Sequence, residues 1–219
     1  FAETFFELEY RLDYKIHNFS KPIISILDGI VMGGGAGLMF ASTYKIATER
    51  TRFAMPEIGV GLFPDVGFTS VIKDLPEGLG LYIMLTASQL NASDMRFCNL
   101  VDSCLHHTKI EDFLLSVVKM AWHDDVNQNL TQLYSMLNSS SYLKGVENFP
   151  SSKIESELEK IQSMTNEDNL IRIIDNIMSN TTEDEWFKKG KESLMKGSPT
   201  SAHLIWLQHL NSSSLSLKE

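Results

Sequence analysis

The first hundred residues alternate between short apolar runs and helical stripes. Residues 1–19 carry apolar side chains three and four positions apart, which predicts an amphipathic helix. The apolar, β-branched run 23–27 predicts a buried strand, and further strands are predicted at 44–48 and 52–55. A helix that continues from Leu38 separates the first two strands. Because strand, helix, strand in this order gives parallel pairing, the pattern predicts an α/β layer.

Beyond residue 67 the pattern becomes mostly helical. Helices are predicted at 68–75, at 79–86 and after an N-cap at Asn91, and a short strand at 101–103 closes this part. From about residue 109 only helical stripes follow. Helix starts are expected at a signal in 165–168, at a capping box made by Thr182 and Glu185, and at Ser198-Pro199. The sequence therefore predicts an α/β core in residues 1–108, followed by an all-helical C-terminal region in residues 109–219.

A glycine cluster follows the first predicted strand. Asp28-Gly29 turns the chain, and Gly33, Gly34 and Gly35 open the next helix. A helix start leaves backbone N–H groups unpaired, and residues without a Cβ let a ligand oxygen approach them. This arrangement suits an oxyanion hole or an anion cradle. The triplet alone suits a simple tight turn equally well.

Two carboxylates, Glu57 and Asp65, lie among apolar residues, glycines and prolines in the run 55–67. Burial in such surroundings raises a carboxyl pKa, which suits a base or a nucleophile. Taken alone, Glu57 also suits a surface position at the end of a strand.

Composition and charge narrow the function classes. The 219 residues are 43% hydrophobic and 21% charged, as in an ordinary globular protein, and the net charge is −9. That charge argues against a nucleic-acid surface. Cys98 and Cys104 match no metal motif and are expected to be buried, reduced thiols. His106-His107 have no carboxylate or cysteine at ligand spacing and are expected to be surface residues, so no metal site is predicted.

Taken together, the two runs in residues 21–67 resemble one family. Lys-Pro, a strand, Asp-Gly, Met-Gly-Gly-Gly-X-Gly-Leu, Phe-Ala-Met-Pro-Glu and Gly-Leu-Phe-Pro-Asp-Val-Gly follow one another almost without a gap. They are similar to the crotonase (enoyl-CoA hydratase/isomerase) superfamily, and within it to the 3-hydroxyisobutyryl-CoA hydrolases. The resemblance implies a crotonase-like spiral of ββα units for the core and continues almost to the C-terminus.

The resemblance also implies roles for individual residues. The Gly34 N–H would be one oxyanion donor, and Gly33, Gly34, Glu57 and Asp65 would bind substrate. Glu57 would be the nucleophile that gives a mixed anhydride, or the base for water, and Asp65 would orient or protonate. Hydratases of the superfamily carry an additional glutamate at the position of Gly37, so hydrolysis is favoured over hydration.

Phe68 departs from the family's small residues after Pro-Asp-Val-Gly, and is expected either to narrow the acyl pocket or to point into the core. The family's second oxyanion donor and much of its coenzyme A pocket lie upstream of the segment matched here. The chain is therefore expected to be a fragment, to lack residues in the structure, or to be unable to bind thioesters normally.

The expected function is hydrolysis of 3-hydroxyisobutyryl-CoA in mitochondrial valine breakdown, with no cofactor apart from the coenzyme A of the substrate. Neither a membrane nor direct nucleic-acid contact is expected. Crotonase relatives often form trimers and hexamers, whereas hydrolase-type members need not. The main alternative is a structural subunit of a large assembly such as the mitochondrial ribosome, and a hydratase or isomerase is a third reading.

Overall fold

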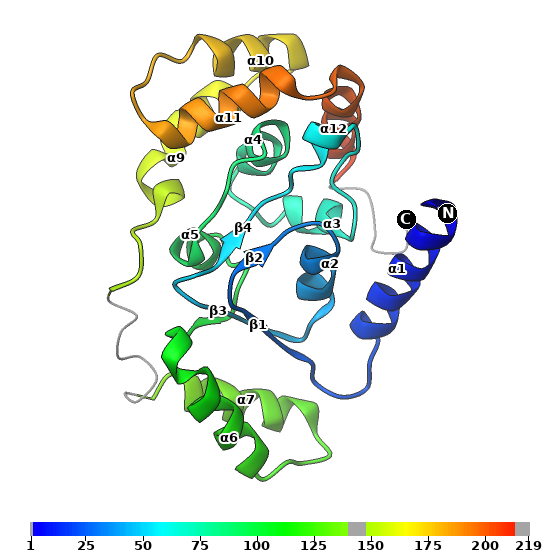
Figure 1. The fold of residues 1–219 in the computed structure, drawn as a ribbon, viewed down its shortest axis with the longest axis vertical. Helices are drawn as coiled ribbons and strands as arrows, with labels where there is room; N and C mark the ends of the chain where they lie inside the picture. The colour runs from blue at the N-terminus through cyan, green and yellow to red at the C-terminus, as the bar shows by residue number, and fades with distance from the viewer. Residues whose placement is uncertain (1, 140–147, 213–219) are drawn as a thin grey trace. The chain divides into compact units, whose positions relative to one another are not determined.

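The structure is a computed structural model of the chain, and it describes residues 2–139 and 148–212 (Figure 1). Two compact units interleave along the sequence. The sheet unit consists of Phe1–Val31, Leu38–Arg52 and Asn91–Ser152, and the helical unit of Met32–Gly37, Phe53–Leu90 and Lys153–Glu219. The boundary at residue 108 between an α/β core and a helical region stays a prediction.

A three-stranded parallel sheet forms the centre of the sheet unit. Strand β1 (Ile24–Leu27) pairs with β3 (Tyr44–Ala47), which pairs with β5 (Ser103–Cys104), in the order β1-β3-β5. The strands predicted at 23–27 and 44–48 are confirmed. The strand predicted at 101–103 begins two residues later, because the Asp102 carboxylate accepts a hydrogen bond from the Lys45 N–H at 2.7 Å. Strands β2 (Ile30–Val31) and β4 (Arg52–Phe53) are short, and the Arg52 N–H donates to the Gly29 carbonyl at 2.8 Å.

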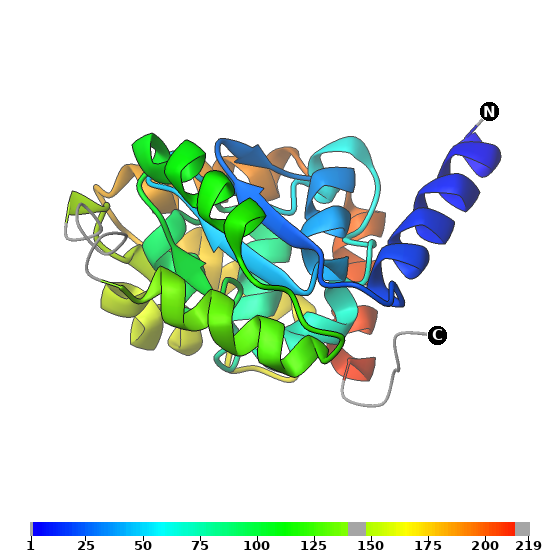
Figure 2. The same cartoon turned by 90° about the horizontal axis from the view of Figure 1, so that it is seen from below.

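Helices α6 (Ile110–Lys119) and α7 (Val126–Leu137) pack on this sheet, as Figure 2 shows in green beside the blue strands. Their apolar stripes meet the strands in one buried cluster, made of Tyr44, Ile46, Leu105, Phe113, Leu133 and Leu137. The Tyr44 hydroxyl shares a hydrogen bond with the Ser103 hydroxyl at 2.6 Å, so the one polar atom of this large side chain is satisfied in the core. The apolar faces that the sequence predicts for these two helices are therefore the faces that pack into the core of the sheet unit.

The remaining helices of the sheet unit are α1 (Ala2–His17), α5 (Ala92–Phe97) and the short η2 (His107–Lys109). Helix α1 is confirmed, but most of its apolar side chains stay exposed, with Phe5 52% and Leu8 63% accessible. Helix α5 begins where the sequence predicts, because Asn91 accepts a hydrogen bond from the Asp94 N–H while Asp94 accepts one from the Asn91 N–H, both at 2.9 Å.

In the helical unit, helices surround α4 (Leu79–Thr86), all eight of whose residues are buried. Helices α9 (Lys153–Thr165), α11 (Glu185–Lys196) and α12 (Pro199–Asn211) contact α4, and α10 (Leu170–Ser179) packs on α9 (Figure 1). Gly190 lets α11 approach closely, since a Cβ there would meet the Thr86 Cβ at 3.2 Å. Helix α3 (Phe68–Ile72) is shorter than the predicted 68–75.

Two predicted helix starts are wrong in detail. Helix α10 is capped by Asn169, whose side chain accepts from the Ile171 N–H at 2.9 Å, and the signal in 165–168 is not used. Helix α11 is capped by Asp184 rather than Thr182, since the Asp184 carboxylate reaches the Trp186 N–H at 2.9 Å and the Thr182 hydroxyl accepts only from the Asp184 N–H. The Ser198 cap with Pro199 at the start of α12 is confirmed.

Over residues 2–139 and 148–212, no strand follows Cys104. None of the helices in these ranges combines the length and the apolar character needed to cross a membrane.

Candidate active site

The glycine cluster opens helix α2 (Gly34–Ala41). Gly33 has a φ of +53°, which L side chains rarely adopt, and open space lies where its Cβ would be. The Ala36 N–H donates to the Gly33 carbonyl at 2.8 Å, so the helix begins four residues before the predicted Leu38. The Gly34 N–H has no backbone acceptor within the described part of the chain. The turn therefore presents a backbone donor that a ligand oxygen can use.

Glu57 is the first residue of the short helix η1 (Glu57–Val60) and is only 6% exposed. Its carbonyl accepts from the Leu62 N–H at 3.0 Å, and Gly61, in the left-handed conformation, ends the helix. The Glu57 Oε2 atom is buried and has no hydrogen-bond partner among the described residues. Burial raises the pKa of Glu57 to about 7, with a smaller contribution in the same direction from the Asp65 carboxylate.

Asp65 lies half-buried in the turn that leads into α3. Its carbonyl accepts from the Phe68 N–H at 2.8 Å. Val66, which follows, has a φ of +44°, an unfavourable conformation for a β-branched residue, and Gly67 is left-handed at +83°. Backbone strain of this kind costs about 1–3 kcal/mol and persists only where neighbouring contacts hold it. Gln208 of α12 supplies one such contact by donating to the Pro64 carbonyl at 2.6 Å.

Phe68 has no exposed surface and packs against the Phe53 ring, with 6.3 Å between the centroids. Phe68 was expected either to narrow the acyl pocket or to point into the core, and in the structure it points into the core. Since both rings are buried in the helical unit, their main contribution is to support the turn that carries Asp65.

The C-terminal helices hold the helix that carries Glu57. The Ser198 N–H, between α11 and α12, donates to the Ile58 carbonyl at 3.0 Å. Gly197 lies so close to η1 that a Cβ would meet the Ile58 Cγ1 at 2.8 Å. Sequence reasoning used Ser198 only as a helix cap and assigned no role to Gly197 or Gln208. The only local signal for this contact is the Gly-Ser-Pro sequence at residues 197–199, and that sequence does not indicate that Ile58 is the partner.

The structure therefore places Gly33, Gly34, Glu57 and Asp65 in the same compact unit, although the residues flanking the glycine run belong to the other one. The negative charge of the Asp65 carboxylate adds a smaller contribution to the raised pKa of Glu57. Two carboxylates in one site, one of them held partly neutral near pH 7, can exchange protons with a substrate. The individual roles assigned to these four residues stay predictions.

The sequence predicts buried, reduced thiols at one other pair of titratable residues and surface histidines without a metal at a second pair. Cys98 and Cys104 are free, buried thiols as expected, and burial raises the pKa of Cys98 to about 12 and that of Cys104 to about 11. The expectation that His106 and His107 lack a carboxylate partner is wrong. Glu49 contacts both imidazoles, and sequence spacing hid it because it lies in another turn of the chain.

Comparison with known proteins places these motifs in a family. The family model described as "Enoyl-CoA hydratase/isomerase" matches residues 1–219. The chain is 33% identical over 218 residues to the "3-hydroxyisobutyryl-CoA hydrolase, mitochondrial" of Xenopus tropicalis, with 100% of this chain and 55% of that protein aligned. It is 40% identical over 106 residues to the "Small ribosomal subunit protein mS47" of Neurospora crassa, with 48% of this chain and 21% of that protein aligned.

A solved structure of an enoyl-CoA hydratase from Rhodobacter sphaeroides has the same fold, with a TM-score of 0.78 at 22% identity over 100% of this chain and 58% of that one. The expected crotonase-like fold is confirmed. The chain spans little more than half the length of the Xenopus relative. With the family model matched throughout, the chain belongs to the enoyl-CoA hydratase/isomerase, or crotonase, family.

Proposed function

We propose that this chain carries the catalytic carboxylates of an acyl-CoA thioester hydrolase whose substrate is 3-hydroxyisobutyryl-CoA. The observation that carries the proposal is Glu57, a buried carboxyl group with one unpartnered oxygen next to a second carboxylate, Asp65. Burying a polar atom without a partner costs free energy, so a group kept this way suits a site that a substrate or water completes.

In the proposed reaction, a Glu57 oxygen attacks the thioester carbonyl carbon and forms a C–O bond, while the π electron pair moves to the carbonyl oxygen. Collapse of this tetrahedral intermediate breaks the C–S bond, and the coenzyme A thiolate leaves and takes a proton. Water then hydrolyses the mixed anhydride, which releases 3-hydroxyisobutyrate and restores Glu57. In the alternative route, Glu57 removes a proton from a water molecule that attacks the thioester directly.

The other residues of the site stabilise the developing oxyanion, make room for the thioester, and orient the substrate or protonate the leaving group. The Gly34 N–H donates to the oxyanion, and one such donor is typically worth about 3 kcal/mol in the transition state. The absence of a Cβ at Gly33 leaves room for the thioester group. Asp65 orients the substrate hydroxyl or protonates the leaving group.

Hydration of a double bond is a weaker proposal. By the resemblance, the first of the two hydratase glutamates would stand at Gly37, which has no side chain, so water addition lacks one of its two acids. The printed name of the Xenopus relative, a mitochondrial 3-hydroxyisobutyryl-CoA hydrolase, supports a hydrolase in the mitochondrion. A role in valine breakdown is part of the same proposal.

The test is release of free thiol from 3-hydroxyisobutyryl-CoA by the whole protein and by its Glu57→Gln variant. We expect turnover by the parent and at least a thousandfold loss in the variant, with Glu77→Gln, an exposed glutamate, as the matched control. Trapping with hydroxylamine separates the two routes, since only an anhydride gives a hydroxamate at Glu57. Equal turnover by parent and Glu57→Gln would refute the proposal.

The similarity to mS47 supports a second candidate, a structural subunit of a large ribonucleoprotein assembly. The retained pair Glu57 and Asp65 opposes it, because a purely structural subunit has no need of a buried, unpartnered carboxyl. Co-sedimentation of the protein with mitochondrial ribosomal particles, together with no thiol release by the folded parent, would favour this candidate over the hydrolase.

A further inference from the structure

A group of side chains with metal-binding chemistry lies in the sheet unit, whereas Glu57 belongs to the helical unit. It consists of Glu49, His106 and His107, and is called the Glu49 cluster below. The parallel pairing of β3 with β5 brings these three residues together. Ala47, near the end of β3, pairs with Cys104 at the end of β5, so the residues that follow each parallel strand leave the sheet at the same edge.

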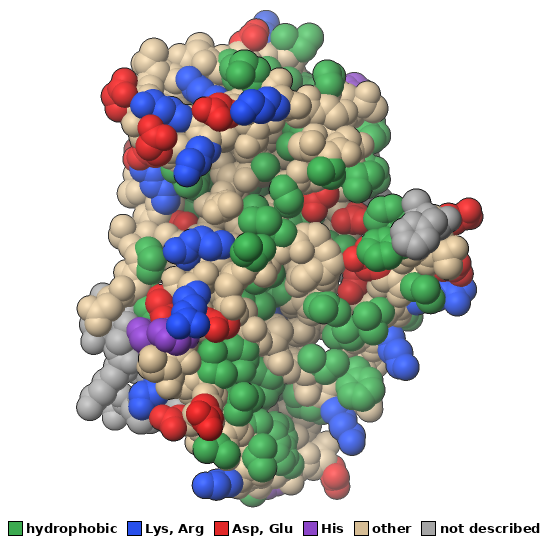
Figure 3. All heavy atoms as spheres, viewed as in Figure 1, with side chains coloured by type: hydrophobic (Ala, Val, Ile, Leu, Met, Phe, Trp, Pro, Cys, Tyr) green, Lys and Arg blue, Asp and Glu red, His purple; other side chains and the backbone are tan. Residues whose placement is uncertain are grey.

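The ligand atoms of the Glu49 cluster converge. One carboxylate oxygen of Glu49 and one ring nitrogen of each histidine lie within 4.8 Å of one another. The Glu49 Oε1 atom is hydrogen-bonded to the His107 Nδ1 and lies 3.5 Å from the His106 Nε2. The three side chains are between 20% and 30% exposed, so they are partly shielded but still open to solvent. Figure 3 shows a histidine patch on the surface, with acidic and basic side chains beside it.

Hydrogen bonds from neighbouring groups hold Glu49 and the His106 ring in place. The His107 backbone N–H donates to the Glu49 Oε2 at 3.0 Å, which leaves Oε1 to face the imidazoles. The His106 Nδ1 lies 2.9 Å from the Thr108 hydroxyl, which fixes the ring with its Nε2 toward Glu49. The Thr108 N–H donates to the same Nδ1 at 3.4 Å, so two contacts from Thr108 set the orientation of the His106 ring.

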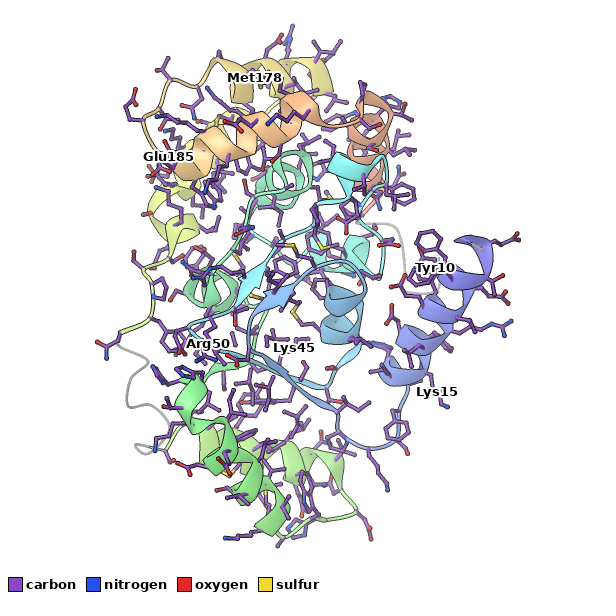
Figure 4. The ribbon with its side chains drawn as sticks, viewed as in Figure 1. Tyr10, Lys15, Lys45, Arg50, Met178 and Glu185 are labelled. Carbon is purple, nitrogen blue, oxygen red and sulfur yellow. The ribbon has the colours of Figure 1, made fainter. Side chains whose placement is uncertain are left out.

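Nearby positive charges are already compensated. Arg50, labelled in Figure 4, follows Glu49 but pairs with Asp28 at 3.4 Å. Lys109 pairs with Asp112 at 3.1 Å.

We infer that the Glu49 cluster is a binding site for a divalent transition-metal cation of the Zn²⁺ class, with Glu49, His106 and His107 as three ligands and water completing the coordination. Imidazole and carboxylate are ligands that Zn²⁺ and Co²⁺ accept, and three protein ligands leave one position open. The cation would lie where the Glu49 Oε1 atom and the ring nitrogens that face it converge. The expectation of no metal site rested on the lack of a carboxylate at ligand spacing, and Glu49 supplies that carboxylate.

The bound cation would join the turn after β3 to the segment after β5. This role is independent of Glu57, so the test uses binding and stability rather than activity. The metal-free whole protein is titrated with Zn²⁺ by calorimetry, and Co²⁺ is added as a spectroscopic probe of the coordination geometry. We expect one equivalent of Zn²⁺ to bind, at least a hundredfold more tightly than Mg²⁺, and to raise the melting temperature.

Two variants and one control make the test specific. Glu49→Gln and His107→Gln keep hydrogen-bonding side chains but remove a ligand, and each is expected to weaken Zn²⁺ binding by about 100-fold or more. His123→Gln changes an exposed histidine outside the cluster and is expected to leave binding unchanged. Circular dichroism checks that each variant is folded. Failure of the parent to bind Zn²⁺, or equal affinity in the parent and both cluster variants, would overturn the inference.

Discussion

The unusual pKa of Glu57 has a consequence for stability that is independent of any substrate. Its carboxyl group ionises in the unfolded chain near the ordinary value of 4.5 but in the folded protein only at about 7, because the group is buried. Between these pH values the folded state holds a proton that the unfolded state has released. The free energy of unfolding therefore falls as the pH rises through this window and levels off above it.

The size of the effect follows from the two values. At about 1.4 kcal/mol per pH unit, a pKa moved from 4.5 to about 7 costs the folded protein about 3 kcal/mol once Glu57 is ionised. Glu57→Gln has nearly the same shape and cannot ionise. We expect the variant to gain stability relative to the parent, by less than about 1 kcal/mol at pH 5 and by about 3 kcal/mol at pH 8.

Urea unfolding of the parent and Glu57→Gln at several pH values between 5 and 8 measures this difference. Glu77→Gln, which removes one exposed carboxylate from the same unit, controls for the loss of a charge. A difference between Glu57→Gln and the parent that stays constant across the range would refute the assignment of a buried, partly protonated Glu57.

Further predictions concern the rate, the support of the site and a helix cap. If ionised Glu57 is the nucleophile or base, kcat/KM for the thioester should rise with pH and level off above about 7, and a rate that falls over that range would contradict this role. Gly197→Ala should lower the free energy of unfolding by about 1–3 kcal/mol and lower kcat, because the added Cβ would lie 2.8 Å from the Ile58 Cγ1. The control is Gly59→Ala, which has open space at its Cβ and should leave kcat near that of the parent. Asn91→Ala should lower the free energy of urea unfolding by about 1 kcal/mol through loss of the α5 capping box, and an unchanged midpoint would show that the cap contributes nothing.

Local signals predicted much of the fold and little of its assembly. The strands at 24–27 and 44–47, the cap at Asn91 and the Ser198-Pro199 helix start depend on a few neighbouring residues, so the sequence contains them directly. The Thr182 cap failed for a local reason, because Asp184 stands closer to the helix and carries a stronger acceptor.

The candidate site was predictable only in part. Glu57 and Asp65 stand in one short run whose apolar and glycine content indicated burial, and Glu57 is buried. The contacts that hold them come from Gln208 and from the junction at Gly197 and Ser198, and the contact of Glu49 with two histidines joins the ends of neighbouring strands. Such contacts depend on tertiary folding, which no local spacing reports.

The contacts to Ile58 and Pro64 also have a consequence for the order in which the protein is made. Synthesis runs from the N-terminus, and every segment of the sheet unit has been made once residue 152 is added. The contacts that hold the helix carrying Glu57 form later, because Ser198 and Gln208 are added more than 40 residues after residue 152. A nascent chain therefore cannot hold the glutamate in its final position early, and a chain interrupted before residue 197 would have a complete sheet unit without a fixed Glu57. Correct placement of this one carboxyl group thus requires that translation has passed Gln208 in α12.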